Sequence, residues 1–461
     1  MGTSCSWLKS SYDLVTGGII REHSGMSMKH TKSDCSKVLG PEALVLHVLG
    51  LWRPQQVGGN LPGVLLASVT LLSIAAVPAG AALRLCGDFP EELEDLALCS
   101  YMLIICSGSF IKAALFIGEG GTLDELVRLM NAIRQQYGSG DSTGCIRNHY
   151  TRMMDTLYRC FQVMAVPSLM WWVVSPLLSI GAQKEGQENH RQLPAPLWLP
   201  ADIHSSPMYE LLYVTQIFCL TLTTEVTLCL DVFFVRLMMM TAAEIEVLNH
   251  NISTMRDFHL KSAVSDNHLR GLKGSELSSM VSDGDQSFPA ADNTTQNGSD
   301  EEMLSRLVKN VLHHQTVLRS VSLLQTSMNI SIFILLFINM ANLCSNMFVT
   351  CGLLQRDGSL TKAMKALLTI PPVLFQTGMY CIFGQITTDQ SEKLSDSAFG
   401  CGWINCNADF KRSLIILMMM VGRPVEITVG KTCQLSKQML LQVLNGTYVL
   451  LNMLFQVRST E

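Results

Sequence analysis

Residues Gln438–Val457 read QMLLQVLNGTYVLLNMLFQV, and this uncharged stretch near the end of the chain decides the fold class. Its length matches the roughly 20 residues of helix that cross a hydrocarbon core about 30 Å thick. Polar side chains interrupt it at Gln438, Gln442, Asn445, Thr447, Asn452 and Gln456. Such groups cost free energy at membrane depth unless they face protein or water. We therefore expect a membrane helix whose polar side hydrogen-bonds to neighbouring helices or lines an aqueous path.

The residues before this helix predict a linker and a shorter helix. From Phe399 the chain reads FGCGWINCNADFKRSLIILMMMVGRPVEITVGKTCQLSK. Residues 390–412 are amphipathic, and Ser413–Gly422 is apolar but too short to span a membrane. Arg423-Pro424 ends this run, because proline cannot continue a helix. Residues 389–457 are therefore expected to form a cytosolic helix followed by the last membrane helix.

The composition is that of a polytopic membrane protein. The 461 residues are 48% hydrophobic and 15% charged, and their mean hydropathy is +0.27. Soluble domains carry about 25% charged residues, and the difference arises here from several long uncharged runs. The net charge of −5 says little about function, because the placement of Lys and Arg matters more in a membrane protein than their sum.

Six further apolar runs of spanning length precede the last helix. Together they predict an all-α protein with seven membrane helices, at Leu61–Leu83, Leu96–Ile117, Cys160–Ala182, Tyr209–Val235, within Ser320–Leu354, Ala366–Thr388 and Gln438–Val457. The first six are expected to form a bundle over residues 61–388. Lys112 lies near enough to a helix end to snorkel, and Pro371-Pro372 predict a kink in the sixth helix.

Polar segments at 119–155, 240–260 and 305–320 keep helical spacing, which predicts cytosolic extensions of the membrane helices. Residues 1–60 are expected to be a cytosolic N-terminal segment, with Pro41–Trp52 lying along the membrane surface. Residues 262–300 are rich in Ser, Asp, Asn and Gly and predict disorder. Residues 458–461 predict a short extracellular tail.

Lysine and arginine predict the orientation of the helices. They are concentrated on the side that holds residues 1–60, even when those beside the long insert are left out because long loops follow the positive-inside rule poorly. The N-terminus is therefore predicted inside the cell and the C-terminus outside. A seven-helix receptor coupled to a heterotrimeric G protein has the opposite orientation.

Catalysis finds no support in the sequence. It contains no paired carboxylates, P-loop, HExxH or GxSxG motif, so no enzyme activity, cofactor or nucleic-acid partner is expected. Cys401, Cys406 and Cys433 have no histidine at zinc spacing, so no metal site is predicted. Glu225 and Asp231 could suggest an ion-coupled transporter, but both approach the cytosolic end of their span and no inverted repeat accompanies them.

Several motifs, in order along the chain, carry a resemblance to a known family. They are Gly50-Leu51-Trp52-Arg53-Pro54, the loop LPAPLWLPADIHSSPMYELLYVTQ at Leu193–Gln216, Tyr380-Cys381 and Phe383-Gly384 followed by SEKLSDSAFGCGW, Gly422-Arg423-Pro424, Val429-Gly430-Lys431 and Leu435-Ser436. In this order the sequence resembles the insect odorant receptor family over essentially the whole chain, most specifically over 366–457. The long insert is similar to that of the family's shared co-receptor, but the fifth and last helices favour a ligand-tuned member. The gustatory branch of the family has a signature of Thr-Tyr, five residues and then Gln-Phe. Thr447-Tyr448 and Phe455-Gln456 match this signature only in part, because their spacing and order differ.

The resemblance implies a non-selective cation channel of four subunits in the plasma membrane of a sensory dendrite. Each subunit would assemble with the co-receptor or with copies of itself, supply its last helix to a central pore, and form a cytosolic anchor domain from the lower ends of helices four to seven. A small volatile molecule would bind in the outer half of each bundle. A homomeric odorant- or gustatory-type channel is the main alternative, and an ion-coupled transporter is a weaker one.

The resemblance also assigns site residues by position. An odorant pocket lined by aromatic and methionine side chains is expected from Tyr101 or Met102, Ser168, Met170, Trp171, Trp172, Ser175, Tyr209, Tyr213, Ile217, Phe375 and Met379. The pore face of the last helix is expected at Tyr448, Leu451, Asn452, Phe455 and Gln456, with a hydrophobic constriction at Leu451 and the next ring at Phe455. Ordinary packing between helices is the alternative interpretation of each of these residues.

Overall fold

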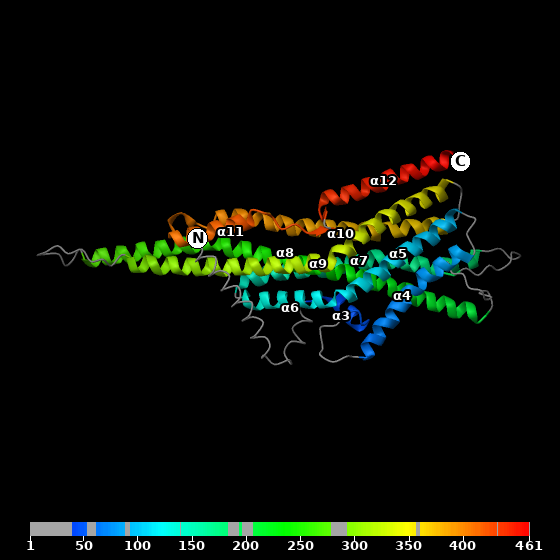
Figure 1. Ribbon diagram of the computed structural model, residues 1–461, viewed down its shortest axis with the longest axis horizontal. Helices are drawn as coiled ribbons and strands as arrows, with labels where there is room; N and C mark the ends of the chain where they lie inside the picture. The colour runs from blue at the N-terminus through cyan, green and yellow to red at the C-terminus, as the bar shows by residue number, and fades with distance from the viewer. Residues whose placement is uncertain are drawn as a thin grey trace, which may run out of the picture.

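The computed structural model describes residues 39–52, 61–87, 93–138, 140–182, 193–195, 206–277, 293–355, 360–430 and 432–460, and almost all of them are helical (Figure 1). The elements are α3 (Pro41–Val48), α4 (Leu61–Gly87), α5 (Leu93–Gly118), α6 (Gly120–Gln136), α7 (Asp141–Ala182), α8 (Met208–Leu277), α9 (Asn293–Gln355), α10 (Leu360–Phe399), η1 (Trp403–Asn405), α11 (Ala408–Val421), β1 (Thr428–Val429), β2 (Cys433–Gln434) and α12 (Lys437–Thr460). The predicted all-α fold class is confirmed.

Six of the described helices are long and apolar enough to cross a membrane. They lie in α4, α5, α7, α8, α9 and α10, and they contain the first six predicted spans. The last helix, α12, has 24 residues and is long enough to span, but its amide side chains lower its hydropathy. α10 continues as one helix through Pro371 and Pro372.

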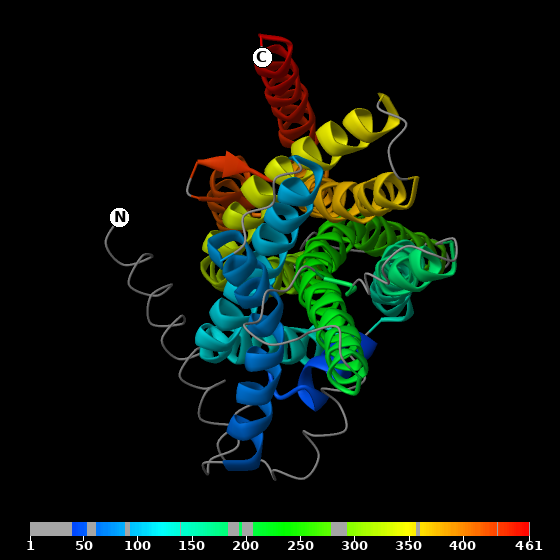
Figure 2. The same cartoon turned by 90° about the vertical axis from the view of Figure 1, so that its right-hand side faces the viewer.

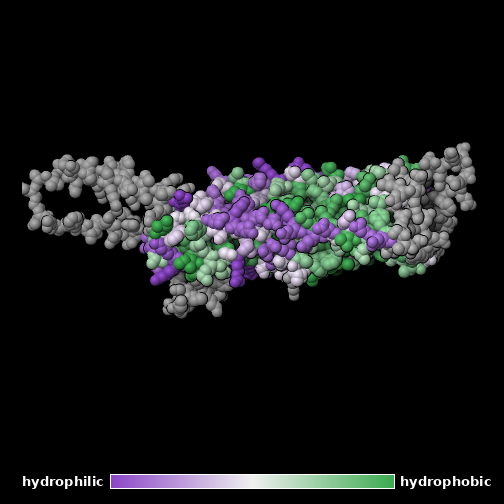
Figure 3. All heavy atoms as spheres, turned by 90° about the horizontal axis from the view of Figure 1, so that it is seen from above, coloured by the Kyte–Doolittle hydropathy of each residue, from purple (hydrophilic) through white to green (hydrophobic). Residues whose placement is uncertain are grey.

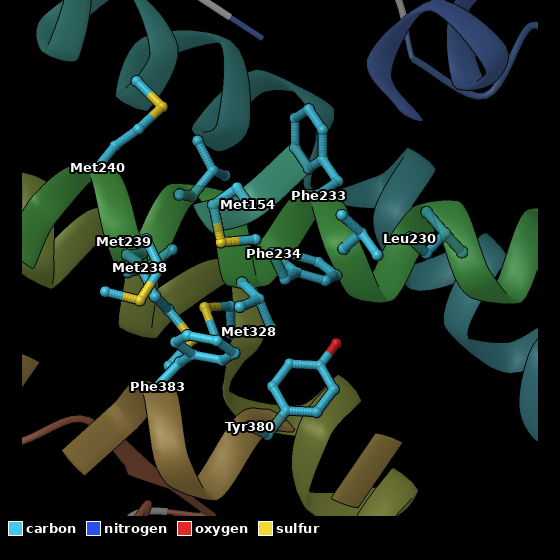
Figure 4. Close-up of a cluster of buried hydrophobic side chains, with 14 of the residues drawn as sticks. Met154, Leu230, Phe233, Phe234, Met238, Met239, Met240, Met328, Tyr380 and Phe383 are labelled. Carbon is cyan, nitrogen blue, oxygen red and sulfur yellow. The ribbon is translucent and has the colours of Figure 1, made fainter. Parts of the chain in front are cut away.

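Helix α8 forms the centre of the molecule. It contacts α3, α4, α5, α7, α9 and α10, and the eight consecutive residues from Leu228 to Val235 are all 2% exposed or less. A helix that is apolar on all sides belongs in the interior. Figure 4 shows the side chains gathered around it, among them Phe233, Phe234, Met238, Met239, Met328, Tyr380 and Phe383.

One prediction about local structure differs from what is observed. Disorder is predicted for residues 262–300, but in the structure α8 continues to Leu277 and α9 begins at Asn293. Residues 278–292 lie outside the described residues. Both segments continue helices that are already formed, so each added residue needs no new nucleation. In Figure 1, α8 and α9 run side by side and project beyond the other elements.

Helix α3 packs against the bundle on one side, while Leu44 and Val48 on its other side are exposed, so its place along the membrane surface stays a prediction. Glu42 and Leu46 are completely buried. Arg236 of α8 donates hydrogen bonds to the Glu42 carboxylate, and at 2.9 Å to Asp155 of α7. A buried guanidinium needs counter-charges, and α3 supplies one of them.

Polar and apolar residues separate along the long axis of the molecule. Figure 3 shows apolar surface over the half that contains the spanning segments and polar surface toward the half with α11. At the polar end Arg147 of α7 donates two hydrogen bonds, of 2.9 and 2.7 Å, to Glu244 of α8. Tyr137 stacks on His313 of α9 with ring centroids 4.1 Å apart, and burial raises the pKa of Tyr137 to about 12.

A two-stranded hairpin leads from α11 into α12. β1 and β2 are antiparallel, with Val429 opposite Cys433. Gly430 has a φ of +62° and lies against Phe333 of α9, so a side chain at this position would be strained and would also clash. This turn sets the point where α12 starts, and Figure 2 shows α12 projecting from the edge of the bundle.

Candidate functional site

The apolar half of the bundle contains a compact aromatic cluster, here called the Tyr101–Trp172 cluster. The two rings stack with centroids 6.1 Å apart and an interplanar angle of 19°. The Lys365 ammonium group lies 5.0 Å from the centroid of the Trp172 ring, where a cation is attracted to the ring face. The remaining buried members of the cluster are Val77, Ala81, Met102, Cys106, Ala195, Cys219 and Leu220.

Other residues predicted for the odorant pocket fall into three groups. Tyr209 and Tyr213 are buried beside one another, and the Tyr213 hydroxyl donates to the Val173 carbonyl of α7. Phe375 and Met379 belong to the central core. Ser168, Trp171 and Ile217 are half-buried, whereas Met170 is 53% exposed on the outside of α7. The structure therefore brings together only part of the predicted set.

A buried ionic centre lies between this cluster and the polar end. Lys112 of α5 and Asp231 of α8 form an ion pair in which both side chains are at most 4% exposed. The Tyr380 hydroxyl of α10 donates to Asp231 at 2.6 Å, and the Gln376 amide donates to its other oxygen. The prediction that Lys112 snorkels is wrong, because its ammonium group finds a counter-charge across the bundle. Opposite charges in two predicted spans were the signal for this pairing.

Helix α12 contacts the rest of the subunit along one face only. Val443 and Thr447 are buried and Phe455 packs on Phe348 of α9 with ring centroids 5.5 Å apart. At 3.6 residues per turn the amides lie within about 40° of one line, opposite Thr447. They are all exposed and are Gln438, Gln442, Asn445, Asn452 and Gln456, here called the amide stripe.

The five predicted pore residues are divided by this arrangement. Tyr448, Asn452 and Gln456 lie on the exposed side, and Tyr448 is 65% exposed. Leu451 and Phe455 are half-buried on the flank that faces α9. Within the described residues no group of three His, Cys, Asp or Glu side chains is placed to hold a metal ion.

The family model of the 7tm odorant receptor matches residues 92–448, which is more than half of the chain. The protein belongs to the odorant receptor family. Odorant receptor 19a of Drosophila melanogaster is 22% identical over 159 residues, which are 34% of this chain and 40% of that protein. Odorant receptor 2a of the same species is 28% identical over 102 residues, or 22% of this chain and 26% of that protein. The matched region thus spans less than half of these relatives.

The fold of this odorant receptor is also found in solved structures. The insect olfactory receptor OR5 from Machilis hrabei in complex with eugenol has a TM-score of 0.68 and is 12% identical, covering 93% of this chain and 99% of that chain. Another structure of the same receptor gives a TM-score of 0.67 at 12% identity, covering 90% and 97%. The receptor is a multi-pass membrane protein of a family of receptors, and it is not an enzyme.

Proposed function

We propose that the receptor is a subunit of an odorant-gated, non-selective cation channel in which α12 lines the pore. The amide stripe carries this proposal. The amides of Gln438, Gln442, Asn445 and Asn452, on the face opposite the subunit, would cost free energy against lipid. Water or a neighbouring subunit would hydrogen-bond to them. A pore at the centre of four subunits supplies both kinds of partner, and Tyr448 and Asn452 would then face it, with Leu451 at its edge.

The ligand site of this proposal is the Tyr101–Trp172 cluster together with Tyr209 and Tyr213. Aromatic and methionine side chains suit a small apolar molecule. The related OR5 fold was solved with eugenol, which supports a small organic ligand here. The subunit would assemble with a shared co-receptor or with copies of itself, in the plasma membrane of a sensory dendrite, with its N-terminus inside and its C-terminus outside.

A route from ligand to pore runs through α10. Its Thr369 interacts with Tyr101, its Tyr380 hydrogen-bonds to Asp231, and its Gly384 touches Leu435 just before α12. A ligand that displaces Tyr101 would therefore act on the same helix that supports the start of α12. Such packed elements transmit small shifts because they have few alternative arrangements.

Cysteine scanning of α12 tests the pore directly. Cysteines placed singly at Gln442, Asn445, Val449 and Asn452 should let a positively charged, water-soluble thiol reagent reduce the odorant-evoked current. Val443→Cys and Thr447→Cys are the matched controls, because both positions face α9 and should be inert. Equal modification on both faces would refute a pore lined by the amide stripe.

Recordings from cells that express the receptor with and without a co-receptor test the assembly. A channel should give inward current within milliseconds of odorant application, and block of G proteins should leave it intact. Current in the absence of a co-receptor would favour the homomeric alternative. Substrate uptake that depends on a counter-ion, with no current, would favour a transporter and would contradict the proposal.

A further inference from the structure

Three asparagines form a line on the inner face of α9. Asn339, Asn342 and Asn346 follow helical spacing and are 1%, 0% and 2% exposed. Asn339 donates hydrogen bonds of 3.0 Å to the side chains of Gln376 and Thr377. In the part of the chain that the structure describes, neither amide atom of Asn342 has a hydrogen-bond partner, and neither does Nδ2 of Asn346.

An unpaired carboxamide in this place needs an explanation. Buried polar groups in proteins are hydrogen-bonded with few exceptions, because removing such a group from water without a partner is costly. Asn342 lies on a membrane helix, so lipid cannot satisfy it either. A small polar molecule held inside the bundle would satisfy it.

Contacts along three helices place Asn342 and Asn346 at the height of the Tyr101–Trp172 cluster. On α10, Thr377 lies beside Asn339, whereas Ala366 packs with Val349, so α9 and α10 are antiparallel. The turn of α10 that faces Asn346 is therefore the turn of Thr369, which in turn interacts with Tyr101 of α5.

The contact between α5 and α9 also places Asn346 level with Tyr101. A Cβ atom on its Gly108 would lie 2.6 Å from Cδ1 of Ile338, so these two residues touch. Tyr101 lies two turns from Gly108, and Asn346 lies about two turns from Ile338 in the matching direction. Because Ile338 faces α5 and Asn339 faces α10, Asn342 is directed between those two helices at 100° per residue.

We propose, building on the proposed ligand site, that Asn342 is its hydrogen-bonding residue, assisted by Asn346. The receptor is then selective for small neutral molecules that carry an alcohol or carbonyl oxygen on an apolar skeleton. A carboxamide donates to one such oxygen and accepts from a hydroxyl group, while the aromatic and sulfur-containing side chains around Tyr101 contact the skeleton. A site that hydrogen-bonds its ligand discriminates strongly against analogues without the polar group.

Matched ligands test this inference. Purified receptor is titrated with 1-octanol, 2-octanone, octanoic acid and octane, and binding is followed by the shift in melting temperature. The alcohol and the ketone should bind the wild type about ten- to a hundredfold more tightly than octane, as expected for one or two hydrogen bonds to a buried group. Asn342→Leu should abolish this preference and leave the affinity for octane within about threefold.

Two further variants serve as controls. Asn329→Leu removes another asparagine of α9 with an unpartnered oxygen, but it lies about 20 Å away along the helix and should keep the preference. Asn346→Leu should weaken the preference for octanol and octanone over octane. If Asn342→Leu does not fold, this variant tests the inference in its place. Equal affinity of the wild type for octanol and octane, binding of the acid alone, or an unchanged preference in Asn342→Leu would each overturn the inference.

The same variants separate this inference from the channel proposal. Selective binding of octanol without any current would refute the proposed channel function but would support the proposed class of ligand. Equal currents in response to octane and octanol would refute the proposed class of ligand but would support the proposed channel function.

Discussion

At the scale of single residues, the charges inside the bundle are held by partners on other helices. Asp231 accepts hydrogen bonds from Lys112, Tyr380 and Gln376. Arg236, five residues further along α8, is held by Glu42 and Asp155. Burying such pairs is close to neutral in free energy, whereas removal of one member leaves an uncompensated charge. These contacts therefore fix which helices meet more than they add stability.

Asp231→Leu should destabilise the receptor by about 3–5 kcal/mol, because Lys112 would remain buried without its counter-charge. Lys112→Met in the same background should restore most of the loss, since the pair is then replaced by apolar side chains. Melting temperature in detergent and the amount of receptor at the cell surface are the measurements. A double variant as unstable as Asp231→Leu alone would show that the ion pair is not the cause.

At the scale of elements, the position of α12 depends on a close contact with α10. A Cβ atom on Gly384 would lie 2.5 Å from Cβ and 2.8 Å from the carbonyl oxygen of Leu435. Leu435 is completely buried, and its N–H donates to the Ile427 carbonyl at 2.9 Å, so its backbone cannot move aside easily. The start of the last helix is thereby held against α10.

Gly384→Ala should displace the start of α12 and cost about 1–3 kcal/mol, the usual cost of overpacking. We expect smaller or altered odorant-evoked currents at normal ligand affinity, because the Tyr101–Trp172 cluster lies far from this contact along α10. Gly378→Ala is the matched control, since nothing lies within 4 Å of a Cβ atom at that position. Equal currents in the wild type and Gly384→Ala would contradict this account.

At the scale of the whole molecule, polar and apolar ends define how the receptor sits in a membrane. The Arg147–Glu244 pair and the extensions of α8 and α9 lie at one end, and the proposed orientation, which rests on the positive-inside rule, puts this end in the cytosol. Two exposed cysteines mark the two ends: Cys86 in the last turn of α4, and Cys145 near the start of α7.

A membrane-impermeant maleimide should label Cys86 on intact cells and Cys145 only after permeabilisation. The receptor variants Cys86→Ser and Cys145→Ser identify which site carries the label, and Cys401, which is buried, should not contribute. Burial also raises the pKa of the Cys401 thiol to about 11, so at pH 7 it lacks the reactive thiolate. Labelling of Cys145 on intact cells would reverse the proposed orientation.

The sequence by itself determined the helices, the membrane spans and the family. A run of about 20 apolar residues is a local property, and the order of the motifs from Gly50 to Ser436 needs no knowledge of contacts. The amides of Gln438–Val457 likewise indicated that the last helix meets something other than lipid. Their common direction follows from helix geometry alone.

Only the tertiary structure decided which face of each helix meets which neighbour. Lys112 and Asp231 are 119 residues apart in the chain, so the opposite charges allow a pair but only the packing of α5 on α8 brings them together. Leu451 and Phe455 lie at helical spacing from Tyr448 and Asn452, yet they turn toward α9 because Phe348 packs there. The sequence could not single out Asn342, because only the packing around it shows that, among the residues that the structure describes, its amide is buried without a hydrogen-bond partner.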